Sequence, residues 1–100
     1  MVYSLRTFIL LFTITLIFAQ DPEGLLSIGE SQLSSGDYSE AELSFNSALQ
    51  ADPSFAPALK ALSKLHLHKG DLNKANDYSN QAVQADEDFR DWATQIGKIT

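Results

Sequence analysis

Two consecutive segments of this chain, residues 22–55 and 56–89, repeat each other at a spacing of thirty-four residues. Chance would give about two identities in such a window, but eleven are present. The identical pairs are Leu25/Leu59, Leu33/Leu67, Gly36/Gly70, Asp37/Asp71, Ala41/Ala75, Asn46/Asn80, Ala48/Ala82, Gln50/Gln84, Ala51/Ala85, Asp52/Asp86 and Phe55/Phe89. A period of this length is typical of stacked helical hairpins. The repeat therefore predicts an all-α chain built from two similar units.

The residues that the two copies share near the middle of each unit are suited to a turn between two helices. Gly36 and Gly70 can adopt the left-handed conformation that ends a helix. Asp37 and Asp71 can then cap the following helix through their side-chain oxygens. Glu40 follows Asp37 by three residues, which predicts a capping box at that helix start. Each copy is thus expected to form a helix-turn-helix unit.

The predicted helices follow from these turns and from the remaining loop signals. Alanines recur at helical spacing in both copies, and such small residues allow paired helices to approach closely. Pro22 and Pro57 fall in first turns, where a missing backbone donor costs little. The expected helices lie near 22–35, 38–51, 55–69, 72–85 and 88–99.

These features resemble the tetratricopeptide repeat family. The first copy carries the family's pattern at Leu25, Ile28-Gly29, Gly36-Asp37-Tyr38, Ala41, Phe45, Ala48-Leu49 and Asp52-Pro53. The second copy is weaker, because Ser63, Ser79 and Glu87 stand where small, aromatic and proline residues are usual. Ile96-Gly97 mark a partial third unit. The resemblance implies an α-solenoid of tandem antiparallel helix-turn-helix repeats, about two and a half in number. Its parts would be repeat one over 22–55, repeat two over 56–89 and a capping helix over 90–100.

The last helix carries its apolar residues on one stripe. Trp92, Ile96 and Ile99 fall at helical spacing, with polar residues elsewhere around the helix. We expect this helix to cap the stack by laying the stripe on helix 72–85 and exposing its polar side to water.

Residues 1–19 have the composition of a secretory signal peptide. Arg6 precedes the largely apolar run 7–18, and Ala19 supplies a small residue before the polar Gln20. The run is shorter than the roughly twenty residues that a membrane-spanning helix needs. We therefore expect cleavage after Ala19 and an exported, periplasmic or secreted domain over 20–100. The alternative is an adaptor tethered to the membrane by an uncleaved segment, residues 7–19. The chain has no cysteine, which excludes disulfides and a bacterial lipid anchor.

Charge is distributed unevenly along the repeats. No basic residue lies between Arg6 and Lys60, so the first repeat is acidic. Helix 55–69 instead carries lysines and histidines and no carboxylate. Self-association is one interpretation, in which the acidic first repeat of one molecule meets the lysine helix of another.

The resemblance also implies a concave groove lined by the first helix of each unit. The inward positions would be Glu23, Leu26, Glu30, Leu33, Ser34, Pro57, Lys60, Lys64, Leu67 and His68, with Thr94 and Lys98 extending the wall. An apolar strip beside basic residues suits an extended or helical peptide that carries carboxylates. The competing interpretation is that the lysines form a solvated face and that Glu30 neutralises Lys64. Family members that clamp the carboxylate tails of chaperones have lysine and asparagine where this chain has Leu26 and Glu30, so that activity is not expected.

Other functional classes find little support. His66 and His68 are two residues apart, whereas helical zinc pairs sit at a spacing of four, so we expect no metal site. Cysteine nucleophiles, phosphate loops and nucleophile elbows are missing from the sequence, so we expect neither an enzyme nor a cofactor. A net charge of −6 disfavours nucleic acid and anionic membrane surfaces. The expected function is a non-enzymatic scaffold that binds a protein or peptide.

Overall fold

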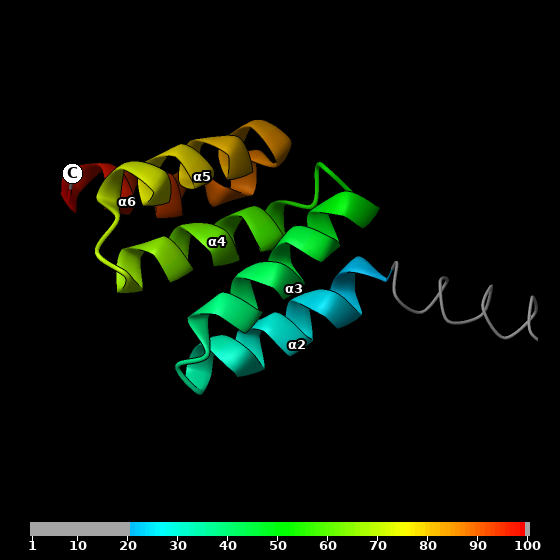
Figure 1. Ribbon diagram of the computed structural model, residues 1–100. Coiled ribbons are helices and arrows are strands. Elements are labelled where there is room, and N and C mark those ends of the chain that lie inside the picture. The colour runs from blue at the N-terminus through cyan, green and yellow to red at the C-terminus, as the bar shows by residue number, and fades with distance from the viewer. Residues whose placement is uncertain (1–20, 100) are drawn as a thin grey trace, which may run out of the picture.

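The computed structural model describes residues 21–99, so the predicted signal peptide and its cleavage site lie outside the described residues. Over this range the chain forms five α-helices and one short 3-10 helix (Figure 1). These are α2 (Pro22–Ser34), α3 (Tyr38–Ala51), α4 (Ala56–His68), α5 (Leu72–Ala85), η1 (Glu87–Phe89) and α6 (Arg90–Ile99). The predicted all-α fold is confirmed. The first four helices end within one residue of their predicted bounds, and the fifth is divided into η1 and α6.

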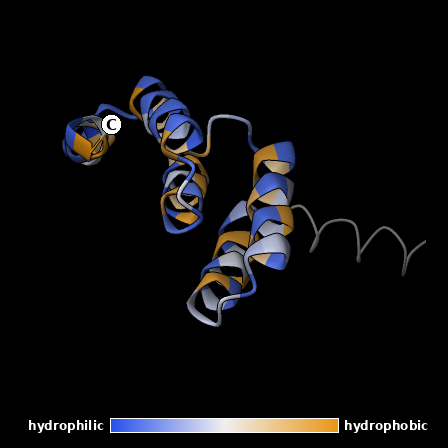
Figure 2. Ribbon diagram, turned by 60° about the vertical axis from the view of Figure 1, so that its left-hand side comes forward, coloured by the Kyte–Doolittle hydropathy of each residue, from blue (hydrophilic) through white to orange (hydrophobic). Residues whose placement is uncertain are grey.

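The helices pack as antiparallel pairs in chain order. Helix α2 pairs with α3 and α4 pairs with α5, while α3 contacts α4 and α6 packs on α5 (Figure 1). Hydrophilic and hydrophobic residues occur together on each helix (Figure 2), so each helix can turn one side to its neighbours and another to water. Because α2 also contacts α4, the first helices of the two units lie next to each other.

The two glycine turns close the hairpins as predicted. Gly36 and Gly70 have positive φ angles of 82° and 79°, which a side chain would strain. The Asp71 carboxylate accepts a bond from the Lys74 backbone N at 3.2 Å. The Asp37 carboxylate makes no such bond, so the predicted cap and capping box at this helix start are wrong. The Asp37 N–H donates to the Gln32 carbonyl at 2.9 Å, so the donor that Glu40 would bind in a capping box already has a partner.

The core lies between the two hairpins. Phe45 from α3 packs with Leu62 and Leu65 from α4, and these three side chains are fully buried. Full burial of each contributes about 1.5–3 kcal/mol to stability. The predicted close approach of the helices is also confirmed, since four of the six repeated alanines are fully buried: Ala41, Ala48, Ala75 and Ala82.

The two units fill equivalent interior positions differently. In the first unit, the Phe45 ring lies directly against Gly29 of α2. In the second unit, Ser79 and Ser63 take these positions, and both are fully buried. The Ser63 hydroxyl donates to the Ala75 carbonyl at 2.7 Å, which satisfies it inside the core.

Helix α6 departs in part from the predicted cap. Ile96 is buried with 1% of its surface exposed, and Trp92 is half-buried. The prediction is wrong for Ile99, which is 53% exposed. The reason is the number of neighbouring helices. Leu65, which takes the same repeat position in α4, is enclosed by helices on two sides, whereas Ile99 lies on α6, which follows α5 at the end of the described stack.

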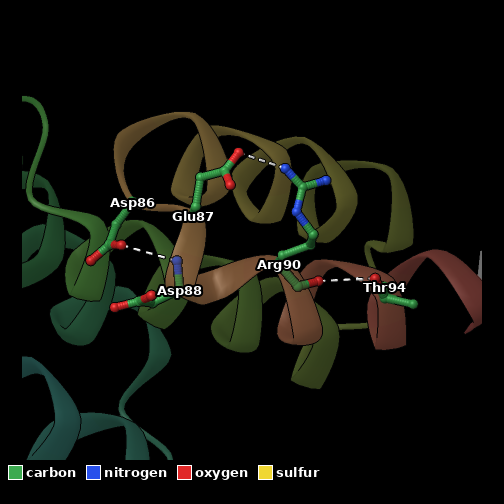
Figure 3. A network of polar contacts seen from close by, with 5 residues as sticks. All are labelled: Asp86, Glu87, Asp88, Arg90 and Thr94. Atoms are coloured by element: carbon green, nitrogen blue, oxygen red, sulfur yellow. Dashed lines mark hydrogen bonds and ion pairs between the residues drawn. The ribbon is translucent and has the colours of Figure 1, made fainter.

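Short polar contacts fix the direction of the chain between α5 and α6 (Figure 3). The Asp86 carboxylate accepts from the Asp88 N–H at 3.0 Å, and Arg90 forms an ion pair with Glu87 at 2.7 Å. Thr94 then donates to the Arg90 carbonyl at 2.9 Å. This corner carries Phe89 and starts the helix that carries Trp92.

Candidate functional site

A concave cavity of about 890 Å³ lies between the first helices of the two units. We call it the groove. One wall comes from α2 and the opposite wall from α4, with contributions from the α2–α3 turn, the start of α3 and η1. Its lining residues are Glu30, Leu33, Ser34, Gly36, Tyr38, Pro57, Lys60, Ala61, Lys64, His68 and Phe89.

Many of the predicted inward residues meet in the groove. From α2 these are Glu30, Leu33 and Ser34, and from α4 they are Pro57, Lys60, Lys64 and His68. The remaining predicted residues do not line it: Glu23, Leu26, Leu67, Thr94 and Lys98. Leu26 instead packs against the core, and the Thr94 hydroxyl donates a hydrogen bond to the Arg90 carbonyl.

Helical periodicity explains the charged wall. Lys60, Lys64 and His68 recur every four residues, so they share one face of α4. The opposite face is occupied by the buried Leu62 and Leu65, which anchor the helix to the core. The groove lysines are therefore carried by a firmly packed helix.

The Lys60 ammonium lies among aromatic rings at one end of the groove. Its Nζ is 5.1 Å from the centroid of the Trp92 ring and 5.9 Å from the centroid of the Phe89 ring. These distances are within the range of cation–π attraction. Lys60 is partly buried as a result, whereas Lys64 is exposed.

A second aromatic contact lies at the other end of the groove. The rings of Tyr38 and His68 are stacked, with centroids 6.3 Å apart and planes inclined by 20°. Glu30 and Lys64 both line the groove, but within residues 21–99 no ion pair joins them, so neutralisation of Lys64 by Glu30 across the groove stays a prediction. The groove thus contains the exposed ammonium of Lys64, with aromatic contacts at both of its ends.

Sequence reasoning missed the two aromatic residues Tyr38 and Phe89. Both enter the groove from the ends of turns rather than from the first helix of a unit, so the inward positions of that helix could not reveal them. The sequence nevertheless contains a signal for each of these two residues. Tyr38 follows the Gly36-Asp37 turn, and Phe89 repeats Phe55.

His66 lies in a different environment from His68. It is 2% exposed, its ring stacks on Tyr78 at 5.5 Å, and its Nε2 is 3.6 Å from the Glu42 carboxylate. Burial lowers the pKa of His66, and the nearby Glu42 acts in the opposite direction. Neither ring nitrogen has a hydrogen-bond partner among the described residues. The same part of the chain holds no cluster of three or more side chains suited to a metal ion.

The hairpin pairs and the groove between their first helices define a tandem helical-repeat protein. A model of the tetratricopeptide repeat family matches residues 32–99, more than half of the chain. The chain therefore belongs to this family, whose domains are generally protein-interaction modules and typically not catalytic. A search of curated proteins found no match.

Proposed function

We propose that the protein holds a peptide or protein partner in the groove and that the partner presents carboxylates to Lys60 and Lys64. The observation that carries this proposal is the meeting of both lysines with Leu33, Tyr38 and Phe89 in one cavity. Apolar lining supplies contact area, and a few charged groups supply orientation, as in other ligand sites.

Electrostatics supports a carboxylate as the charged group of the partner. Hydrogen bonds between an ammonium and a carboxylate are stronger than those between neutral groups. Lys60 is partly shielded from water by the Trp92 and Phe89 rings, and an ion pair is screened less in such surroundings. The overall charge of −6 opposes phosphate-rich nucleic acid.

Charge reversal tests the proposal. Lys60→Glu and Lys64→Glu should each weaken capture of a partner from a cell-envelope extract, because each replaces an attraction with a repulsion. Lys74→Glu is the matched control, since Lys74 is exposed on α5 and does not line the groove. Circular dichroism should show unchanged helicity in all three variants. Equal capture by the groove variants and the control would reject this surface.

We also propose that the domain is exported after cleavage behind Ala19, on the strength of the residue pattern in 1–19. Among the helices of residues 21–99, none combines the length and the apolar character needed to cross a bilayer. Sequencing the amino terminus of the mature protein tests the proposal, with a start at Gln20 expected. An intact segment 7–19 in the membrane fraction would favour the tethered adaptor. Self-association stays a prediction, tested by whether lower salt raises the apparent mass.

A further inference from the structure

A short chain of contacts links the interior of the second unit to the groove. The Ser63 hydroxyl donates to the Ala75 carbonyl at 2.7 Å and accepts from the Trp92 Nε1–H at 3.2 Å. The Trp92 ring in turn lies 5.1 Å from the Lys60 ammonium. Because Ser63 is fully buried, this chain starts in the core and ends at a groove residue.

The contact exists because the second unit departs from the repeat pattern. In the first unit, the Phe45 ring of α3 fills the space beside Gly29. The second unit has Ser79 at the position of Phe45 and Ser63 at that of Gly29. A serine hydroxyl therefore stands where the first unit has no side chain, and it holds an indole from α6.

As a consequence, the side chains of the two groove lysines differ in conformational freedom. Lys60 is partly buried and held over two rings, whereas Lys64 is exposed and makes no ion pair within residues 21–99. A free lysine loses much rotamer freedom when a partner fixes it. Lys60 has lost part of that freedom before binding, and such preorganisation increases affinity.

We infer that Trp92 is a positioning residue of the groove, through which α6 holds the Lys60 ammonium ready for the partner. The inference rests on the proposed function of the groove. It assigns α6 a role beyond covering the end of the stack. Since coupling between two equilibria is reciprocal, occupation of the groove also strengthens the docking of α6.

The positioning can be measured without a ligand. In the NMR spectrum of the full protein, ring currents should shift the Lys60 Hε protons upfield, while the Lys64 Hε protons serve as an internal control. Trp92→Leu removes the nearer ring and should move the Lys60 signals most of the way to the Lys64 position, while Phe89, 5.9 Å away, keeps a small part of the shift. Ser63→Ala keeps the ring but removes the acceptor of the indole N–H, together with the bond to the Ala75 carbonyl, and should reduce the shift in part. If Trp92→Leu does not fold, Ser63→Ala and Trp92→Phe carry the test.

Binding is measured with a fluorescein-labelled hexaglutamate peptide. Trp92→Leu should weaken binding by about two- to fivefold, the factor expected for one exposed cation–π contact, and Ser63→Ala should weaken it by less, although neither residue lines the groove. Trp92 is the only tryptophan in the chain, so its fluorescence should also change when the peptide binds.

The outcomes separate the inference from the proposed function. Weaker binding in both variants together with a reduced Lys60 shift, larger in Trp92→Leu than in Ser63→Ala, supports the inference. Unchanged affinity in both variants, while Lys64→Gln weakens binding, overturns the positioning role and leaves the proposed function intact. Equal Hε shifts for Lys60 and Lys64 in the unaltered protein also overturn it. Failure of the unaltered protein to bind hexaglutamate rejects the acidic partner, and the inferred role in binding falls with it.

Discussion

Gly29 offers a sharp test of how the first hairpin is packed. A Cβ atom added to Gly29 would lie 2.6 Å from Phe45 Cδ1 and closer still to Phe45 Cε1. Phe45 is fully buried, so its ring has little room to move. Overpacking of this kind costs about 1–3 kcal/mol, and the better helix propensity of alanine returns at most about 1 kcal/mol. We expect Gly29→Ala to lower the free energy of unfolding by about 1–2 kcal/mol, which corresponds to a melting temperature lower by roughly 5–15 °C.

Gly97 supplies the matched control for this prediction. It takes the same repeat position in α6, but a Cβ atom added there meets nothing within 4 Å. Gly97→Ala should therefore leave stability unchanged or raise it slightly. Urea unfolding followed by circular dichroism measures both variants. Phe45→Leu should partly relieve the clash, so the double variant with Gly29→Ala should lose less stability than the sum of the single changes. Equal stability of Gly29→Ala and Gly97→Ala would refute the proposed close packing.

Three further predictions concern stability. Burial lowers the pKa of His66 below its ordinary 6.5, so folding favours the neutral ring. The contribution of His66 to stability is therefore complete above pH 6.5 and is lost as the pH falls through the lowered pKa. His66→Leu should flatten this part of a urea-denaturation pH profile, and an unaltered profile would contradict the assignment. Gly70→Ala should cost about 1–2 kcal/mol because φ is +79°; thermal unfolding checks this, and no change would mean that the turn adopts another conformation. Ile96→Ser should destabilise by several kcal/mol and Ile99→Ser by less than about 0.5 kcal/mol, given exposures of 1% and 53%, and equal effects would contradict the placement of α6.

The repeat allowed the helices and their pairing to be predicted well. Its thirty-four-residue period depends on small residues and turn glycines, whose roles are set by local geometry. Gly36, Gly70 and the buried alanines therefore lie as predicted. Exposure at the end of the stack was harder to predict, because a helical stripe does not show how many neighbours a helix has. Ile99 falls on the stripe and is nevertheless exposed.

The candidate site was predictable only where it follows the first helices. The family resemblance placed Lys60, Lys64 and His68 in the groove, and their four-residue spacing puts them on one face of the helix. Tyr38 and Phe89 were missed because turns bring them to the groove. The bond between Trp92 and Ser63 joins residues that are 29 positions apart, and it depends on space left by the missing aromatic residue at position 79. Such tertiary contacts have no local sequence signal.

Site-specific photo-crosslinking tests the central claim, that the groove binds a partner, most directly. A photoreactive residue at Ser34 would lie in the groove, and one at Gln81 would lie on an exposed part of α5 outside its lining. We predict one specific adduct from Ser34, absent from Gln81, whose yield falls when Lys64→Glu is added. An adduct of equal yield from both positions, or one indifferent to Lys64→Glu, would contradict the account.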